Sequence, residues 1–233
     1  MDDRPRRAWY QRRVRLLALC ALAAACAACG SAPAPAPTPA PAVPSPAAVN
    51  PARIDRSRSV LPAGYEVIPY TGRPTATALW GLRDPALVDP AQCAELSAPS
   101  VDAASAHGWS ASGPGGIAYA VVAPETRDAA ASAGRLMADC PRWTVSSGPT
   151  TATVTQVPGP AIEAAPTMGM RTEAATVVEG GTETRSHADT FVAHLEGYVC
   201  LVALVTDPGA PHPALAPDFA SNLLAETVSA LRG

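Results

Sequence analysis

Short apolar runs separated by turn residues occupy most of the chain after residue 50, and they predict strands more often than helices. We expect strands at residues 65–70, 75–80, 108–112, 117–123, 142–147, 151–157, 171–180, 184–195 and 198–206. Clusters of Gly and Pro separate several of these runs, as is typical of hairpin turns. The last three runs follow one another closely, so they predict a three-stranded meander.

Three segments carry helical signals instead, at residues 89–96, 125–139 and 216–232. In the first, Asp89 is a candidate N-cap and Pro90 falls in the first turn. The second is rich in alanine and is followed by Pro141. The third repeats its apolar residues at helical spacing and carries Arg232 in its last turn, where the helix dipole favours a cation.

Consecutive hairpins with few helices between them indicate an antiparallel sheet. The fold class that follows is α+β, an antiparallel sheet with two or three helices packed mainly on one face. The length of residues 51–233 suits a single domain.

The first 28 residues have the form of a signal peptide. Six of the first fifteen residues are arginines, and residues 16–28 carry no charge. A bilayer-spanning helix needs about 20 apolar residues, so this run is too short to be one and fits the core of a signal peptide instead. The arginine pairs at residues 6–7 and 12–13 leave a twin-arginine export signal open.

Cys29 is the candidate lipid attachment site. Two alanines precede it and Gly30 and Ser31 follow it, which is similar to the cleavage junction of bacterial lipoproteins. Cys26 is the alternative, and a plain secretory signal with incidental cysteines is a third interpretation. A lipoprotein cysteine carries diacylglycerol on sulfur, and two or more acyl chains give stable anchoring. We therefore expect a protein held by lipid on the outer face of the cell membrane.

Residues 29–50 are expected to be a lipidated cysteine followed by a tether. The Ala/Pro repeats here lack the apolar side chains that build a core and favour extended polyproline II. From residue 29 onward, eleven arginines oppose eighteen acidic residues, a net charge of −7. Nucleic-acid binding needs a basic surface, so we expect no nucleic-acid partner.

The chain shows no recognisable set of catalytic or metal-binding residues. The histidines His107, His187, His194 and His212 lack metal-ligand spacing. The segment "GWSASG" is not a Gly-x-Ser-x-Gly elbow, and the glycines at 113–116 precede a strand rather than a helix, which indicates a hairpin turn and not a phosphate loop. We expect neither an enzyme nor a bound metal or cofactor.

Two groups of residues are candidates for a ligand cleft. The tryptophans Trp80, Trp109 and Trp143 favour core packing, although a cleft would use the same residue type. Glu179, Glu183 and Arg185 surround a Gly-Gly turn, and Glu183 and Arg185 would share one face of a strand. A solvated hairpin tip with a surface ion pair is favoured for them over a polar cleft.

The order of several motifs resembles the extracellular sensor domain of mycobacterial Ser/Thr protein kinases and its free-standing lipoprotein relatives. The motifs are Asp-Pro-x-x-Cys at 89–93, a Trp-bearing strand "GWSAS", an alanine-rich helix ending in "DCPRW", and a C-terminal amphipathic helix. The resemblance covers residues 60–232. The segments "LPAGYEV", "GWSASGPGGIAYAVVA" and "VVEGGTETRS" are also similar to an actinobacterial lipoprotein family of unknown function.

The resemblance implies a disulfide between Cys93 and Cys140 and an unidentified small ligand bound in a cleft. The second disulfide of the sensor family is missing, because only Cys200 stands in that region; this puts an identical ligand in doubt. Cys200 is then left unpaired. It lies in "YVCLVALV", a run apolar on both faces, which predicts a central strand and a buried thiol.

Two classes of function follow. The first is a non-catalytic, membrane-anchored binding or sensing module for an unknown envelope ligand. The second is a structural or assembly-partner lipoprotein of the envelope without a small ligand. A concave, aromatic-lined pocket would favour the first, and a flat apolar patch would favour the second.

Overall fold

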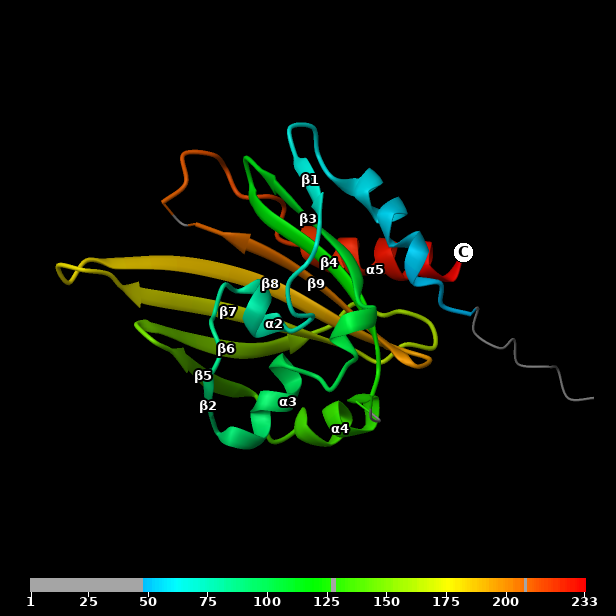
Figure 1. Cartoon of the computed structure of the whole chain (residues 1–233), viewed down its shortest axis with the longest axis horizontal. Helices are drawn as coiled ribbons and strands as arrows, with labels where there is room; N and C mark the ends of the chain where they lie inside the picture. Colours follow the sequence, from blue (N-terminus) through cyan, green and yellow to red (C-terminus); the bar gives the residue numbers. More distant parts are fainter. Residues whose placement is uncertain (1–47, 127–128, 208) are drawn as a thin grey trace, which may run out of the picture. The chain divides into compact units, whose positions relative to one another are not determined.

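A single antiparallel sheet of nine strands organises the chain in the computed structural model, which describes residues 48–126, 129–207 and 209–233 (Figure 1). The strand order is β1-β3-β4-β9-β8-β7-β6-β5-β2. The predicted signal peptide, Cys26, Cys29 and most of the tether lie outside the described residues.

The strands are β1 (Glu66–Pro69), β2 (Leu87–Asp89), β3 (His107–Gly113), β4 (Gly116–Pro124), β5 (Arg142–Ser147), β6 (Thr150–Pro158), β7 (Thr167–Val177), β8 (Glu183–Leu195) and β9 (Tyr198–Thr206). The α-helices are α2 (Ala76–Leu79), α3 (Ala94–Ser97), α4 (Ala129–Leu136) and α5 (Phe219–Arg232), and the 3₁₀ helices are η1 (Pro51–Val60), η2 (Ala91–Cys93) and η3 (Ala103–Ser105). From β5 to β9 each strand pairs with the next one in the chain. The α+β class, the β3–β4 and β5–β6 hairpins and the final meander are therefore confirmed.

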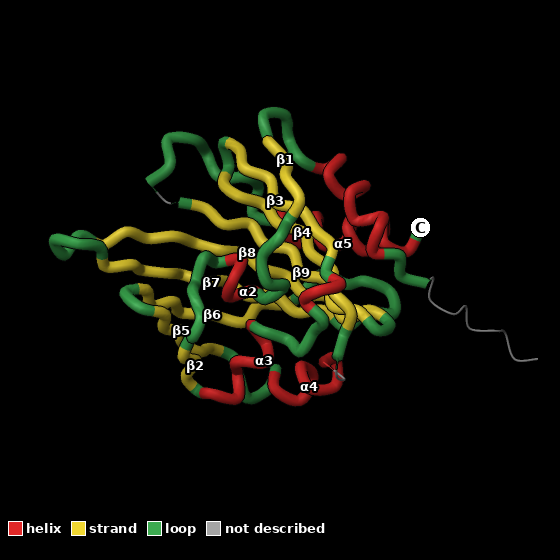
Figure 2. Tube along the Cα trace, viewed as in Figure 1, coloured by secondary structure: helices red, strands yellow, loops and turns green. Residues whose placement is uncertain are grey.

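Helices cover both faces of the sheet, so the expectation that they pack mainly on one face was wrong. One apolar core lies between the sheet and α2, α3 and α4, and the other lies between the sheet and η1 and α5 (Figure 2). The 3₁₀ helix η1 was not predicted, because its sequence has no apolar stripe, and Ile54 is its one large buried apolar side chain. The helix is stabilised by contact with α5 rather than by an apolar stripe of its own.

The segment predicted as a strand at 75–80 is the short helix α2. The Thr75 hydroxyl accepts a hydrogen bond from the Ala78 amide at 3.3 Å, which is the arrangement of an N-cap. The preceding strand β1 has a different partner, since Glu66 lies opposite Ser112 of β3. The capped helix α2 and the pairing of β1 with β3 therefore take the place of a hairpin between residues 65–70 and 75–80.

The helix predicted at 89–96 begins later than expected. Asp89 is the last residue of strand β2, where it pairs with Thr144, and it is not the helix cap. The helical turns η2 and α3 begin after Pro90. The helix expected at 125–139 is shorter in the structure, where α4 has the bounds Ala129–Leu136.

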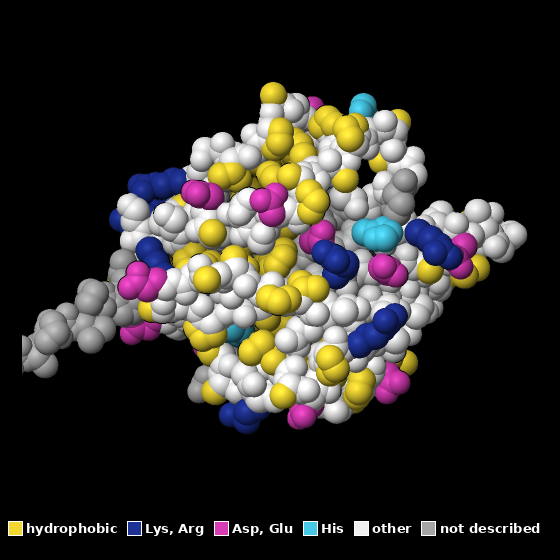
Figure 3. All heavy atoms as spheres, turned by 180° about the vertical axis from the view of Figure 1, so that it is seen from behind, with side chains coloured by type: hydrophobic (Ala, Val, Ile, Leu, Met, Phe, Trp, Pro, Cys, Tyr) yellow, Lys and Arg dark blue, Asp and Glu magenta, His cyan; other side chains and the backbone are white. Residues whose placement is uncertain are grey.

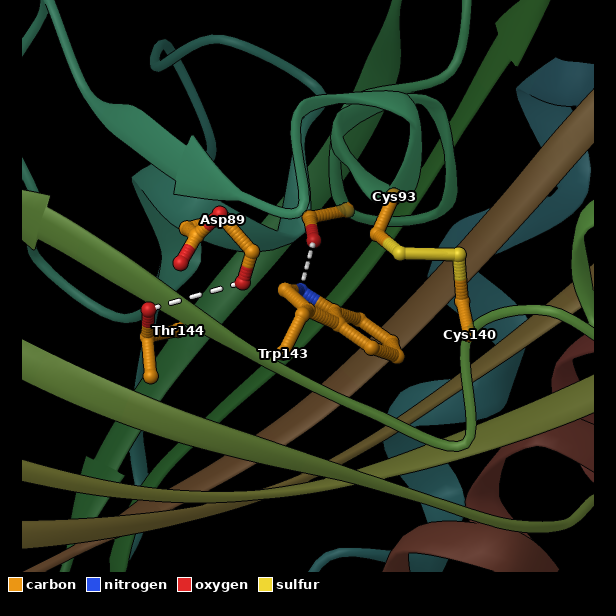
Figure 4. The surroundings of a disulfide bond; sticks show 6 residues. Asp89, Cys93, Cys140, Trp143 and Thr144 are labelled. Carbon is orange, nitrogen blue, oxygen red and sulfur yellow. Dashed lines mark hydrogen bonds between the residues drawn. A yellow bond between two sulfur atoms is a disulfide. The ribbon is translucent and has the colours of Figure 1, made fainter.

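Cys93 and Cys140 form a disulfide, which confirms the implied pairing (Figure 4). Both residues are fully buried, with their Cα atoms 5.8 Å apart. The bond joins the η2–α3 segment to the end of α4. Beside it, the Trp143 indole donates a hydrogen bond to the Ser97 hydroxyl at 3.0 Å.

Cys200 is a free thiol in strand β9, and it is fully buried. Its strand lies between β4 and β8, with an apolar core on each face. Burial raises the pKa of the thiol to about 12, because an apolar environment disfavours the thiolate. The prediction of a buried, unpaired cysteine in a central strand is confirmed.

We expect a Cys200→Ala substitution to lower the free energy of unfolding by about 1 kcal/mol, because it removes one small buried group. Iodoacetamide should modify Cys200 only after the protein is unfolded, since the reactive thiolate is scarce and inaccessible in the folded state. Peptide mass spectrometry after labelling with and without denaturant measures this. Rapid labelling of the folded protein would contradict the burial of the thiol.

Candidate functional site

The three tryptophans proposed for a cleft are core residues on opposite faces of the sheet. Trp80 and Trp143 lie in the core beneath α2–α4, whereas Trp109 lies in the core beneath α5. Each indole N–H has a partner: Trp80 donates to Thr190 at 2.8 Å, and Trp109 donates to Ser57 at 3.2 Å. The tryptophans and the acidic hairpin therefore do not form one cleft, and core packing is the role that the structure supports.

Glu183 and Arg185 share one face of β8, as predicted, and form an ion pair with an N–O distance of 2.7 Å. Both side chains are largely solvent-accessible, so the pair contributes only about 0–1 kcal/mol to stability. Glu179 is exposed in the turn between β7 and β8, which projects beyond the neighbouring strands (Figure 1). This agrees with a solvated hairpin tip, but Glu183 and Arg185 also line a hollow.

The hollow arises because α5 covers only part of its face of the sheet. This helix packs against β4, β8 and β9. It leaves uncovered the parts of β6, β7 and β8 that lie toward the β7–β8 turn. Polar side chains occupy the uncovered positions, where Glu173 lies opposite His187 and Arg171 lies opposite Asp189. Figure 3, which views the molecule from behind, shows acidic, basic and histidine side chains gathered on one face.

The first hollow lies between the β3–β4 turn, the adjoining ends of β8 and β9, and the loop that follows β9. Its volume is about 570 Å³, and its polar side chains include His187, Asp207 and His212. The loop can approach the turn closely because residue 115 is a glycine. A Cβ atom at Gly115 would lie 2.6 Å from Cγ of Leu215, so any other residue here would require the Leu215 side chain to shift.

The second hollow adjoins the first and lies on the open strands themselves. It has a volume of about 440 Å³ and is lined by Thr151, Thr153, Glu173, Ala174, Ala175, Glu183, Arg185, Ser186 and His187. Ser186 and His187 line both hollows. We call the two together the sheet-face groove.

The sheet-face groove has the properties of a binding surface. Hydroxyl, carboxylate, guanidinium and imidazole groups line its strand end, and mainly apolar groups line its loop end. No hydrogen bond joins His187 or His212 to a hydroxyl or a carboxylate within the described residues, so no nucleophile–base pair is assembled there. The described part of the chain also contains no group of three or more His, Cys, Asp and Glu side chains that could hold a metal ion.

Sequence reasoning identified the polar hairpin but missed most of the groove. No pattern in the sequence marks His187, Glu173, Asp207 or His212 as a site residue. The alternation of Arg185, His187 and Asp189 in one strand was a usable signal that they share a face. The pairing of Glu173 with His187 depends on strand register, which a single strand's pattern does not reveal.

Fold and groove together define an α+β domain with one large antiparallel sheet and an open, partly polar groove on one of its faces. The chain belongs to the family described as Domain of unknown function (DUF5642), whose model matches residues 50–232. No curated protein matches the chain.

Two solved structures are similar to this fold. An uncharacterized protein from Mycobacterium smegmatis, the Rv0999 ortholog, has 19% sequence identity and a TM-score of 0.54, and the match covers 79% of this chain and 98% of that one. The extracellular domain of PknH from Mycobacterium tuberculosis has 13% identity and a TM-score of 0.46, with 79% and 92% covered. Within the described residues, none of the helices has the length and apolar character needed to cross a membrane.

Proposed function

We propose that this protein is a lipid-anchored envelope protein whose domain binds a ligand in the sheet-face groove without catalysing a reaction. The observation that carries the binding role is the pair of adjoining hollows that meet at His187. Their volumes lie within the range of about 300–1,000 Å³ that is typical of small-molecule sites.

The proposed location outside the cell membrane rests on the sequence and on the disulfide. A basic head, a short apolar run and the Cys29-Gly-Ser junction support export and lipidation. The Cys93–Cys140 disulfide supports an oxidising compartment, because such bonds form and persist outside the cytosol.

The alternative role, a structural lipoprotein without a small ligand, has less support. Within the described residues, the exposed large apolar side chains are Ile68, Leu87, Ile117, Val177 and Val178. They are distributed over β1, β2, β4 and the end of the β7–β8 hairpin rather than over one element. The groove is concave, although no Trp, Tyr or Phe from the described residues lines it.

Native mass spectrometry of the protein purified from the membranes of its own host tests the binding role. We expect a non-covalent small-molecule adduct on the wild-type protein. Substituting Glu173→Gln together with His187→Ala should reduce the bound fraction at least about tenfold, since a carboxylate and an imidazole that line the groove are altered. These side chains are exposed, so the fold should be retained.

The matched control is Glu66→Gln, which removes an exposed carboxylate from the edge strand β1. This variant should keep the adduct at the wild-type level. Absence of any adduct on the wild-type protein, or equal retention by the groove variant, would contradict a ligand in the groove.

A further inference from the structure

A second, much smaller cavity lies away from the groove, between α4 and the adjoining ends of β7 and β8. Its volume is about 30 Å³. A cavity of this size can hold one ion or one water molecule but no organic ligand of ordinary size. Its lining residues are Ala130, Ala133, Gly134, Met137, Pro166, Thr167, Met168 and His194.

His194 presents one ring nitrogen that is already bound and one that is free. The side chain is 5% exposed, and its Nδ1 lies 3.2 Å from Oε1 of Glu125. A carboxylate only accepts hydrogen bonds, so Nδ1 carries the proton of this contact, and in the neutral imidazole Nε2 then has the lone pair. Nε2 has no hydrogen-bond partner within the described residues, and the side chain borders the cavity.

This arrangement matches the way proteins orient metal-binding histidines. Such a histidine commonly donates its second N–H to a carboxylate, which fixes the ring and makes the ligating nitrogen more basic. Glu125 occupies the carboxylate position here. It directly follows β4, whereas His194 lies near the end of β8.

Two thioethers border the same cavity. Met168 of β7 is 2% exposed, and Met137 follows α4. The remaining polar side chain, Thr167, already donates its hydroxyl to the Pro160 carbonyl at 2.7 Å. The lining side chains that could supply ligands to an ion are therefore the imidazole of His194 and the thioethers of Met137 and Met168.

The backbone around Met137 is held from several directions. The Met137 amide donates to the Ala133 carbonyl at 2.9 Å. Cys140, three residues after Met137, forms the disulfide with Cys93. The Gln156 amide, in the orientation that gives both of its ends a partner, donates to the Met137 carbonyl at 3.0 Å. The disulfide and these hydrogen bonds thus hold the segment after α4 to η2 and to β6.

We propose that Met137, Met168 and His194 form a binding site for a soft monovalent metal ion, Cu(I), with Glu125 positioning the imidazole. Thioether sulfur selects soft ions such as Cu(I), and imidazole also suits copper. Zn²⁺ is excluded as the preferred ion, because its protein sites use thiolate, imidazole and carboxylate ligands in a tetrahedral set.

The test uses the full chain with Cys20, Cys26, Cys29 and Cys200 replaced by alanine, so that no free thiol competes for the ion. Ag(I) serves as the redox-inert probe, followed by methyl NMR of protein labelled with ¹³C at the methionine methyl groups. One equivalent should shift the Met137 and Met168 signals and leave that of Met170 unchanged. Met170 is the internal control because it is fully buried in the same strand but does not border the cavity.

Affinity for Cu(I) is then measured anaerobically by competition with bicinchoninate. Met137→Leu and Met168→Leu should each weaken binding at least about tenfold, while Met170→Leu leaves it unchanged. Leucine conserves volume, so these variants should stay folded. Glu125→Gln should weaken binding about 10- to 100-fold, as substitutions of groups that orient a metal ligand do.

Three results would overturn the proposal. The first is the absence of any Ag(I)-dependent shift of the Met137 and Met168 methyl groups. The second is an equal loss of Cu(I) affinity in Met168→Leu and Met170→Leu. The third is one equivalent of Zn²⁺ producing the same shifts, since thioether ligands should not select it.

Discussion

Replacing both Cys93 and Cys140 by alanine is expected to lower the free energy of unfolding by about 4 kcal/mol. The disulfide closes a loop of 47 residues, and a cross-link of that length reduces the entropy of the unfolded chain by roughly this amount. Domains are commonly stable by about 5–15 kcal/mol, so the loss is a large share of the total. Urea unfolding of wild-type and variant protein, monitored by tryptophan fluorescence, measures the difference.

Cys200→Ala is the matched control for the disulfide variant. It also removes a fully buried sulfur but breaks no cross-link, so it separates loss of packing from loss of loop closure. A difference of less than about 1 kcal/mol between the two variants would show that the disulfide does not stabilise the fold through chain entropy. Non-reducing peptide mapping that finds both thiols free would contradict the bond itself.

Replacing Cys29 by alanine is expected to abolish lipid anchoring. Without the thiol no acyl chain can be attached, and each buried methylene of such a chain contributes about 0.8 kcal/mol to membrane affinity. The variant should either appear in the medium or remain as an unprocessed precursor. Membrane fractionation and intact-mass measurement in the native host distinguish these two forms from the wild-type lipoprotein.

The matched control is Cys26→Ala, which leaves Cys29 in place. It should behave as wild type if Cys29 is the modified residue. Retention of the Cys29→Ala variant in the membrane with unchanged intact mass would assign the anchor elsewhere, with Cys26 as the next candidate.

Only part of the candidate groove could be predicted from the sequence. Alternation along a strand indicates which residues share a face, and Glu183 with Arg185 was read correctly in this way. Whether that face is covered depends on where α5 packs, and nothing in a strand's own pattern records this. The strand pattern around Trp109 likewise did not reveal that this residue faces the opposite core from Trp80.

The metal site proposed beneath α4 could not be predicted from the sequence. Its residues come from the segment after β4, the end of α4, the start of β7 and the end of β8. Metal motifs are recognised in a sequence by short ligand spacing, and Met137 and His194 are too far apart to provide any. Their proximity is a product of sheet register and helix packing.

The sequence by itself determined the strands from β3 onward, the terminal helix and the buried position of Cys200, because alternation, turn residues and apolar runs act over a few residues. Tertiary structure decided the rest. The helix α2 and the strand β2 depend on partners far along the chain, and η1 packs against α5, β3 and β4. Covering both faces at one end of the sheet while leaving the other end open is a matter of where whole elements pack. That arrangement depends on long-range contacts, and it is what creates both the sheet-face groove and the cavity beneath α4.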